Sequence, residues 1–250
     1  RAVVGWGAGT EARSLAGGTL PCPSAAFFNA FSIHCLEWDA VHEPAVVHAL
    51  SVVTAALLAS SDRLGGSTTD AFLTALAVGV DIASGLGLSA AGGMRFFRPA
   101  TAGIIGATLA VARLEGLDPA RMTNAVGLAY SFLSGTMQAH VEASTALPIQ
   151  IANAARGAIM ANDLAKAGVD GPHDILTGPF GYDALIEPIQ LEDYLASLGR
   201  VWRISEVSIK PYPSGRASHG ALGALADLRD KGLVSIENVE SIELLAPPLI

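Results

Sequence analysis

Residues 102–119 read AGIIGATLAVARLEGLDP. The first part of this stretch is rich in Ala, the residue with the highest helix propensity, and Gly116 closes it at a position typical of a helix C-terminus. Asp118 then offers a capping side chain, and Pro119 suits the first position of a following helix. The stretch therefore predicts two helices joined by a short turn.

Similar signals extend in both directions along the chain. Ser67 to Asp70 is a good helix start, and Gly168 is a typical helix end. We expect helices over residues 46–60, 67–85, 102–115, 119–133, 148–167 and 218–231, with a loop over 170–188. After residue 198 the pattern alternates between apolar and polar, which predicts strands over 201–209 and 239–245.

Composition supports a helical core. The 250 residues include 44 Ala and 27 Gly, 51% are hydrophobic and only 15% are charged, which fits helices that approach one another closely. We expect a mainly α fold: an all-helical domain over residues 1–205, followed over residues 206–250 by the beginning of a smaller α+β domain. The strand over 239–245 needs partners, which we expect in residues outside this chain.

Charge and hydropathy exclude several kinds of partner. A net charge of −8 with three lysines and no basic run argues against nucleic acid and anionic membranes. Residues 44–61 lack charged side chains but contain His48, and the next apolar run ends at Asp81, short of the ~20 residues of a membrane span. Two cysteines make no disulfide framework. We therefore expect a cytoplasmic protein without a membrane span.

The densest polar cluster is HCLEWDAVHEPAVVH, residues 34–48, with three histidines and three carboxylates. Pro44 and the change of period predict a loop, with His48 in the first turn of the next helix. The positive end of the helix dipole favours a neutral imidazole there, which suits a general base.

Two other interpretations of this cluster stay open. His42 and His48 with Asp39 or Glu37 could ligate zinc or iron, although a six-residue spacing between the histidines is not a standard ligand spacing. The cluster could also be a buried structural hydrogen-bond network.

A second cluster, IKPYPSGRASH, covers residues 209–219. Lys210, Arg216 and His219 gather at the start of the predicted helix from Ser218, where free backbone N–H groups favour anions. The pattern predicts an anion site, with a solvated surface turn as the alternative.

A third cluster places Arg98 directly before an apolar helix, where it either binds a carboxylate or caps the carbonyls of a neighbouring helix. Gly103 and Gly106 make no dinucleotide fingerprint, because no strand precedes them and the spacing is wrong. The sequence also contains no nucleophile elbow and no Walker A motif. We therefore expect no cofactor and no metal.

Several spaced blocks together resemble the MmgE/PrpD family. They are Asn29-x4-His34-x-Leu36-Glu-Trp-Asp39-x2-His42-x5-His48, Gly116-Leu-Asp118, Asn124-Ala-x-Gly-x-Ala129, Ala154-Ala-Arg-Gly157, Gly171-Pro172, and Lys210-Pro-Tyr-Pro with His219. The resemblance covers nearly the whole chain. It implies a helical domain that lacks its N-terminal part, the start of an α+β domain, and an active site between the two.

The resemblance also implies a chemistry. Members of the family, among them 2-methylcitrate dehydratase, cis-aconitate decarboxylase and iminodisuccinate epimerase, add or remove a proton, water or carbon dioxide next to a carboxylate without a metal. By position, Asp39, His42, His48, Lys210 and His219 match functional residues of the family.

Three departures from the family pattern stand out. Glu37-Trp-Asp-Ala-Val-His42 replaces Asp-Phe-Asp-Asp-Thr-His, and Arg98-Pro99 replaces His-Pro. Leu147 stands where a lysine is expected, which leaves Gln150 as the nearest polar group.

These observations lead to a hypothesis of a cofactor-independent lyase of the 2-methylcitrate dehydratase type. His48 would abstract a proton α to a carboxylate, with His219 or His42 as the acid and Asp39 orienting a histidine. The substrate-binding residues would be Lys210, Arg98, Arg216 and Gln150. The alternatives are an epimerase, isomerase or decarboxylase on a related acid, or a non-catalytic binding or assembly module. Ala-rich, Lys-poor helices also suggest a homodimer.

Overall fold

The computed structural model describes residues 1–245 and confirms a mainly α fold. The long helices are α1 (Cys22–His34), α2 (Ala49–Arg63), α3 (Thr69–Leu88), α4 (Arg98–Leu114), α5 (Pro119–Ser131), α7 (Leu147–Lys166) and α10 (His219–Asp230). The short helices are α6 (Gln138–Val141), α8 (Tyr182–Leu185) and α9 (Glu192–Ser197), with 3-10 turns η1 (Val3–Trp6), η2 (Arg203–Glu206) and η3 (Arg216–Ser218). The strands β1 (Ala12–Arg13) and β2 (Thr19–Leu20) pair antiparallel.

Local capping signals account for several helix ends. The Thr68 and Asp118 side chains accept hydrogen bonds from the backbone N–H groups of Ala71 and Arg121 and so cap α3 and α5. Gly116 and Gly168 follow α4 and α7 with φ of 70° and 90°. These ends are where the sequence predicts them. α4 begins four residues earlier than predicted, since a proline is tolerated in the first turn of a helix. No bounds were predicted for α1, α6 and α9, and the short helix α8 lies within the predicted loop.

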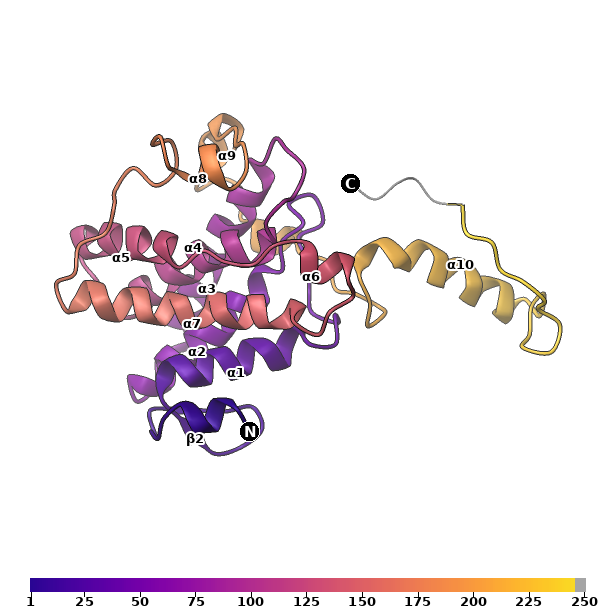
Figure 1. Ribbon diagram of the computed structural model, residues 1–250, viewed down its shortest axis with the longest axis horizontal. Coiled ribbons are helices and arrows are strands. Elements are labelled where there is room, and N and C mark those ends of the chain that lie inside the picture. The colour runs from indigo at the N-terminus through magenta and orange to yellow at the C-terminus, as the bar shows by residue number, and fades with distance from the viewer. Residues whose placement is uncertain (246–250) are drawn as a thin grey trace.

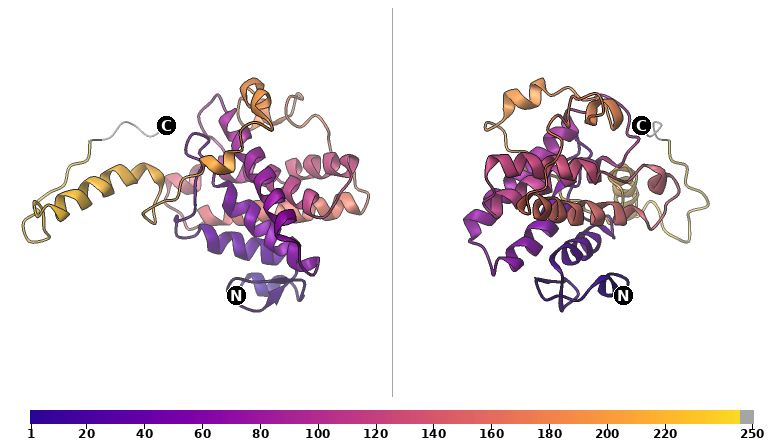
Figure 2. Two further views of the ribbon diagram at one scale, coloured as in Figure 1. Left: turned by 180° about the vertical axis from the view of Figure 1, so that it is seen from behind. Right: turned by 60° about the vertical axis from the view of Figure 1, so that its left-hand side comes forward.

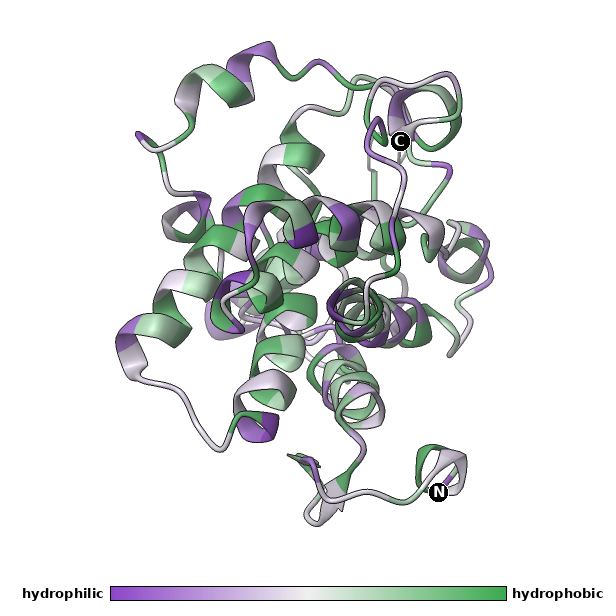
Figure 3. Cartoon of the chain, turned by 90° about the vertical axis from the view of Figure 1, so that its left-hand side faces the viewer, coloured by the Kyte–Doolittle hydropathy of each residue, from purple (hydrophilic) through white to green (hydrophobic). Residues whose placement is uncertain are grey.

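α4 lies at the centre of the bundle and packs against α2, α3, α5 and α7, while α1 packs on α2 and α7 (Figure 1). Hydrophobic residues run along these helices (Figure 3), and most of the buried side chains are small. Where α3 crosses α4, a Cβ added at Gly79 would lie 2.7 Å from the Ala110 Cβ and 2.9 Å from the Gly106 carbonyl oxygen. Ala and Gly therefore set the close helix spacing that the composition predicts.

By length and composition, α3 is the one helix of residues 1–245 that could cross a membrane, yet half of its most apolar window is buried in the protein. Asp81, within this helix, lies 3.2 Å from the Arg203 guanidinium, and both side chains are buried. This packing supports the interpretation of the apolar stretches as core helices. The cytoplasmic location stays a prediction.

Both predicted strands near the end of the chain are wrong. Residues 201–209 contain η2 and only a single bridge, Ser208 to Val41, and residues 239–245 form no strand. A strand forms only where a neighbouring segment satisfies its backbone groups, and the described residues supply none there. α10, the predicted helix near the end, projects away from the bundle (Figures 1 and 2).

The predicted domain boundary at 205/206 stays a prediction. Part of the segment assigned to the α+β domain, residues 246–250, lies outside the described residues.

The α3–α4 crossing can be tested by adding one methyl group. Gly79→Ala should destabilise the protein by about 1–3 kcal/mol, because the overpacked methyl group outweighs the gain in helix propensity. Gly223→Ala in α10, where an added Cβ meets no atom within 4 Å, should instead stabilise by about 0.5–1 kcal/mol. Urea unfolding of both variants measures the difference, and equal effects would contradict this account of the crossing.

Candidate active site

The loop between α1 and α2 is held against the segment from Ser208 to Arg216. The backbones of Val41 and Ser208 exchange two hydrogen bonds, of 3.1 and 2.8 Å. The Trp38 indole N–H donates to the Lys210 carbonyl at 3.0 Å, and the Arg216 guanidinium donates to Glu43 at 2.8 Å. Two segments about 170 residues apart in sequence are thereby joined along one edge.

Asp39 is the centre of a buried ion cluster in this loop. Its Oδ2 accepts hydrogen bonds from His34 Nδ1 at 2.8 Å and from the Ser51 hydroxyl. His48 Nδ1 lies 3.2 Å from the same oxygen, and Lys210 Nζ lies 3.6 Å from Oδ1. Burial alone raises the pKa of Asp39, but the close contacts with His34 and His48 lower it well below its usual range. Asp39 is therefore an anion throughout the physiological pH range.

Helix ends position the two histidines of this cluster. His34 is the last residue of α1, and His48 is the N-cap residue of α2, one position before the predicted first turn. Their ring centroids are 5.0 Å apart. The His34 side chain is fully buried, whereas that of His48 is 11% exposed. Of the two, His48 is the one that solvent and small molecules can reach.

Lys210 and His219 lie close together, on the buried side of the cluster. The Lys210 ammonium is fully buried and donates to the carbonyl of Glu37 at 2.7 Å and to that of Ser214 at 3.4 Å. His219 Nε2 contacts the same Ser214 carbonyl at 3.3 Å. Lys210 thus lies beside Asp39, with its charge directed at groups of the protein.

The structure separates His42 from the cluster. Its Nδ1 accepts the Ala45 backbone N–H at 3.2 Å, and its Nε2 contacts Glu206 at 3.1 Å. Both ring nitrogens are engaged and the residue is buried, which leaves neither nitrogen free to act as the predicted acid. Asp39 lies beside His48.

Arg98 is not the free, substrate-facing cation that the sequence predicts. Its guanidinium makes a bidentate contact with the buried Glu187, with Nε to Oε2 at 2.8 Å, and it also donates to the Ala45 carbonyl at 3.0 Å. Because a buried carboxylate already neutralises its charge, Arg98 joins α4 to the segment before α2 and to Glu187.

The two remaining predicted substrate-binding residues differ in access. Gln150 packs against Gly135, and its Oε1 is buried without a hydrogen-bond partner among the described residues. The Arg216 side chain is 47% exposed, and that of its partner Glu43 is 37% exposed. Arg216 is therefore the predicted cation that can exchange its partner for a ligand carboxylate.

A metal site is the alternative interpretation of this cluster. His34, Asp39 and His48 offer nitrogen and oxygen atoms within 4.8 Å of one another, so His34 would take the place the sequence gives to His42. However, a hydrogen bond already joins His34 to Asp39, and the Lys210 ammonium lies beside the same carboxylate. This donor set suits protons and an ammonium group better than a divalent cation.

Two cavities lie elsewhere. One of about 190 Å³ is lined by His173 and residues of α5, and one of about 480 Å³ is lined by Tyr194, Arg203 and the Ser89 segment. Neither is lined by His48.

Comparison with known proteins identifies the family of the chain. The model of the MmgE/PrpD N-terminal domain matches residues 1–191. The chain belongs to the MmgE/PrpD family. Mouse and human cis-aconitate decarboxylases are 28% and 27% identical to it over 91% of its length, and the Aspergillus terreus enzyme is 27% identical over 83%. The chain spans about half the length of these MmgE/PrpD relatives, 49%, 50% and 46% respectively.

His34 and Ser51 were not among the predicted site residues, and Glu37 was named only as an alternative metal ligand. His34 stands in the first motif quoted for the MmgE/PrpD resemblance, and its spacing of three residues to Glu37 favours a contact at the end of a helix. That signal was available in the sequence. The local sequence does not predict a role for Ser51, because only the packing of α1 and α2 brings its hydroxyl to Asp39.

The Arg98–Glu187 pair predicts a stability effect. Arg98→Met should destabilise the protein by about 3–5 kcal/mol, because it leaves Glu187 buried without its cation. The double variant Arg98→Met/Glu187→Leu should recover most of this loss. If Arg98→Met instead keeps full stability and only raises the KM for substrate, Arg98 binds substrate after all. Thermal unfolding and steady-state kinetics separate the two outcomes.

His34 predicts a pH dependence of stability. Burial alone lowers its pKa, but the contacts to Asp39 and Glu37 outweigh burial and raise the pKa to about 9. The folded protein therefore binds this proton more tightly than the unfolded chain does. The resulting stabilisation, on the order of 3 kcal/mol, is complete below about pH 6.5 and is lost as the pH rises through about 9.

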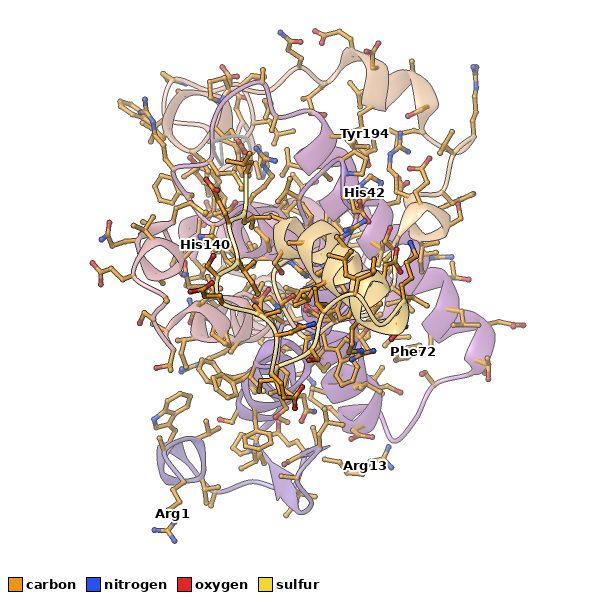
Figure 4. All side chains as sticks on the ribbon, turned by 90° about the vertical axis from the view of Figure 1, so that its right-hand side faces the viewer. Arg1, Arg13, His42, Phe72, His140 and Tyr194 are labelled. Carbon is orange, nitrogen blue, oxygen red and sulfur yellow. The ribbon has the colours of Figure 1, made fainter. Side chains whose placement is uncertain are left out.

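In urea unfolding measured from pH 6.5 to above pH 9, the free energy of unfolding of the wild type should decline as the pH rises. The decline should be smaller than in the wild type for His34→Gln. It should equal the wild-type decline for the control His140→Gln, which alters an exposed histidine of α6 (Figure 4). An unaltered decline in His34→Gln would refute the assignment.

Proposed function

We propose that this protein is a cofactor-independent lyase that acts on a polycarboxylic acid, with His48 transferring a proton at the carbon next to a carboxylate. The observation that carries the proposal is the position of His48 beside the buried Asp39, with Nδ1 3.2 Å from the carboxylate and 11% of the His48 side chain exposed. With Nδ1–H directed at an anion, Nε2 is the nitrogen that exchanges a proton with a substrate.

The other residues act through this histidine. Asp39 orients the imidazole and stabilises the positive charge that develops on it, as a carboxylate does for the histidine of a catalytic triad. Lys210 holds Asp39 and the loop around it in place. Arg216, about half exposed, binds a substrate carboxylate by exchanging Glu43 for it, and His219 remains the candidate acid.

The proton balance is simple for either lyase reaction. In a dehydration, the C–H bond breaks, its proton goes to His48 Nε2, and the electron pair expels the hydroxyl group, which leaves as water after protonation by the acid. In a decarboxylation, the electron pair comes from the bond to the departing carbon dioxide, and protonated His48 delivers its proton to the resulting carbanion.

The names of the curated relatives favour decarboxylation. They are cis-aconitate decarboxylases at 27–28% identity, so cis-aconitate and other tricarboxylates are the first substrates to assay, ahead of 2-methylcitrate. The expected partners, a small polycarboxylate and a second copy of the chain, remain part of this proposal.

The test is an assay of the full protein with di- and tricarboxylates in deuterated water, following carbon dioxide, water loss and deuterium at the α carbon. His48→Ala should lower kcat by about 10²- to 10⁴-fold, whereas His140→Ala should leave it unchanged. Wild-type turnover by His48→Ala would reject the proposed base.

Two other results would point to the alternative functions. Deuterium incorporation without loss of carbon dioxide or water would identify an isomerase or epimerase. No turnover, together with no shift in melting temperature at millimolar polycarboxylate, would support a non-catalytic module.

A further inference from the structure

His34 is buried against two carboxylates at once. Its Nδ1 lies 2.8 Å from Asp39 Oδ2, and its Nε2 lies 3.0 Å from Glu37 Oε1. Nδ1 makes a hydrogen bond to Asp39, whereas Nε2 and Glu37 Oε1 approach each other without an aligned hydrogen bond. Because a carboxylate lies beside each ring nitrogen, this geometry favours the positively charged imidazolium.

When His34 is an imidazolium, its charge and those of the groups around it sum to zero. Glu37 and Asp39 are the two anions, and Lys210, 3.5 and 3.6 Å from their oxygens, is the second cation beside the His34 imidazolium. His48 faces the ring edge at a centroid distance of 5.0 Å, and the Phe97 ring covers another side at 6.2 Å. Two anions and two cations form a neutral set without any charge on His48, in which Glu37 is partly exposed and the other three side chains are buried.

Of the three side chains that contact Asp39 Oδ2, only two form hydrogen bonds to it. The His34 imidazole and the Ser51 hydroxyl both donate to Oδ2, which occupies the two lone pairs of that oxygen. His48 Nδ1 reaches the same oxygen at 3.2 Å but makes no aligned hydrogen bond. His34 and Ser51 therefore hold the carboxylate, and His48 rests against an anion that these two residues have already oriented.

We propose that His34 is a positioning residue: a buried imidazolium that, with Ser51, fixes Asp39 in the orientation that presents its charge to His48 Nδ1. His34 does not touch substrate. This inference rests on the proposed function, in which His48 transfers the proton, and it adds the group that sets the tautomer and orientation of His48.

Kinetics of two variants of the full protein test the role. His34→Leu removes both contacts and should lower kcat by about 100-fold, the cost of a small displacement of a reacting group, with KM changed less than about threefold. His34→Asn, whose amide N–H can replace Nδ1–H, should recover at least about tenfold of this loss. Wild-type kcat and an unchanged pH profile in His34→Leu would overturn the proposal.

A direct measurement keeps the test independent of turnover. Nitrogen-15 NMR of the histidine rings in the wild type should show both His34 nitrogens protonated at about pH 7.5 and His48 as the Nδ1–H tautomer. In His34→Asn the His48 tautomer should persist, and in a folded His34→Leu it should be lost, while His140→Gln should leave both signals unchanged. A neutral His34, or an unchanged His48 tautomer in His34→Leu, would refute the role.

The two proposals can fail separately. If the wild type turns over no polycarboxylate, the proposed function fails, and the ring-nitrogen spectra still decide the state of His34. If the wild type is active and His34→Leu matches it, only the positioning role fails.

Discussion

A carboxylate buried beside α1 and α2 is costly to ionise unless cations and hydrogen-bond donors surround it. Asp39 meets this requirement with groups from three separate segments: His34 at the end of α1, His48 and Ser51 at the start of α2, and Lys210 from the far end of the helical unit. The same contacts that compensate the charge bring these segments together. Stability and candidate chemistry therefore depend on one carboxylate.

The small residues of the bundle make this meeting possible. Because Ala and Gly let α4 approach α2, α3 and α7 closely, the end of α1 and the beginning of α2 meet at one edge of the bundle. A larger residue at Gly79 or Ala110 would separate helices that indirectly support the loop from residue 35 to residue 48.

Most cations of this region are paired with carboxylates of the protein. Lys210 is directed at Glu37 and Asp39, and Arg98 is paired with Glu187. A buried cation that already has a carboxylate partner gains little by binding another carboxylate, whereas an exposed one exchanges partners readily. For that reason Arg216, whose side chain is 47% exposed, is the cation of this region that we propose to bind a substrate carboxylate.

The sequence by itself determined the features that depend on neighbours within about one helical turn. The caps at Thr68 and Asp118, the glycines after α4 and α7, and the dense cluster from His34 to His48 were readable because each signal acts over a few residues. Tertiary structure alone decided which groups meet: Asp39 pairs with His34 and His48 rather than His42, and Arg98 pairs with a glutamate 89 residues away. It also decided against the two strands, since a strand needs a partner segment and a buried ion needs a counter-ion, and both are chosen by packing across the whole chain and not by local sequence.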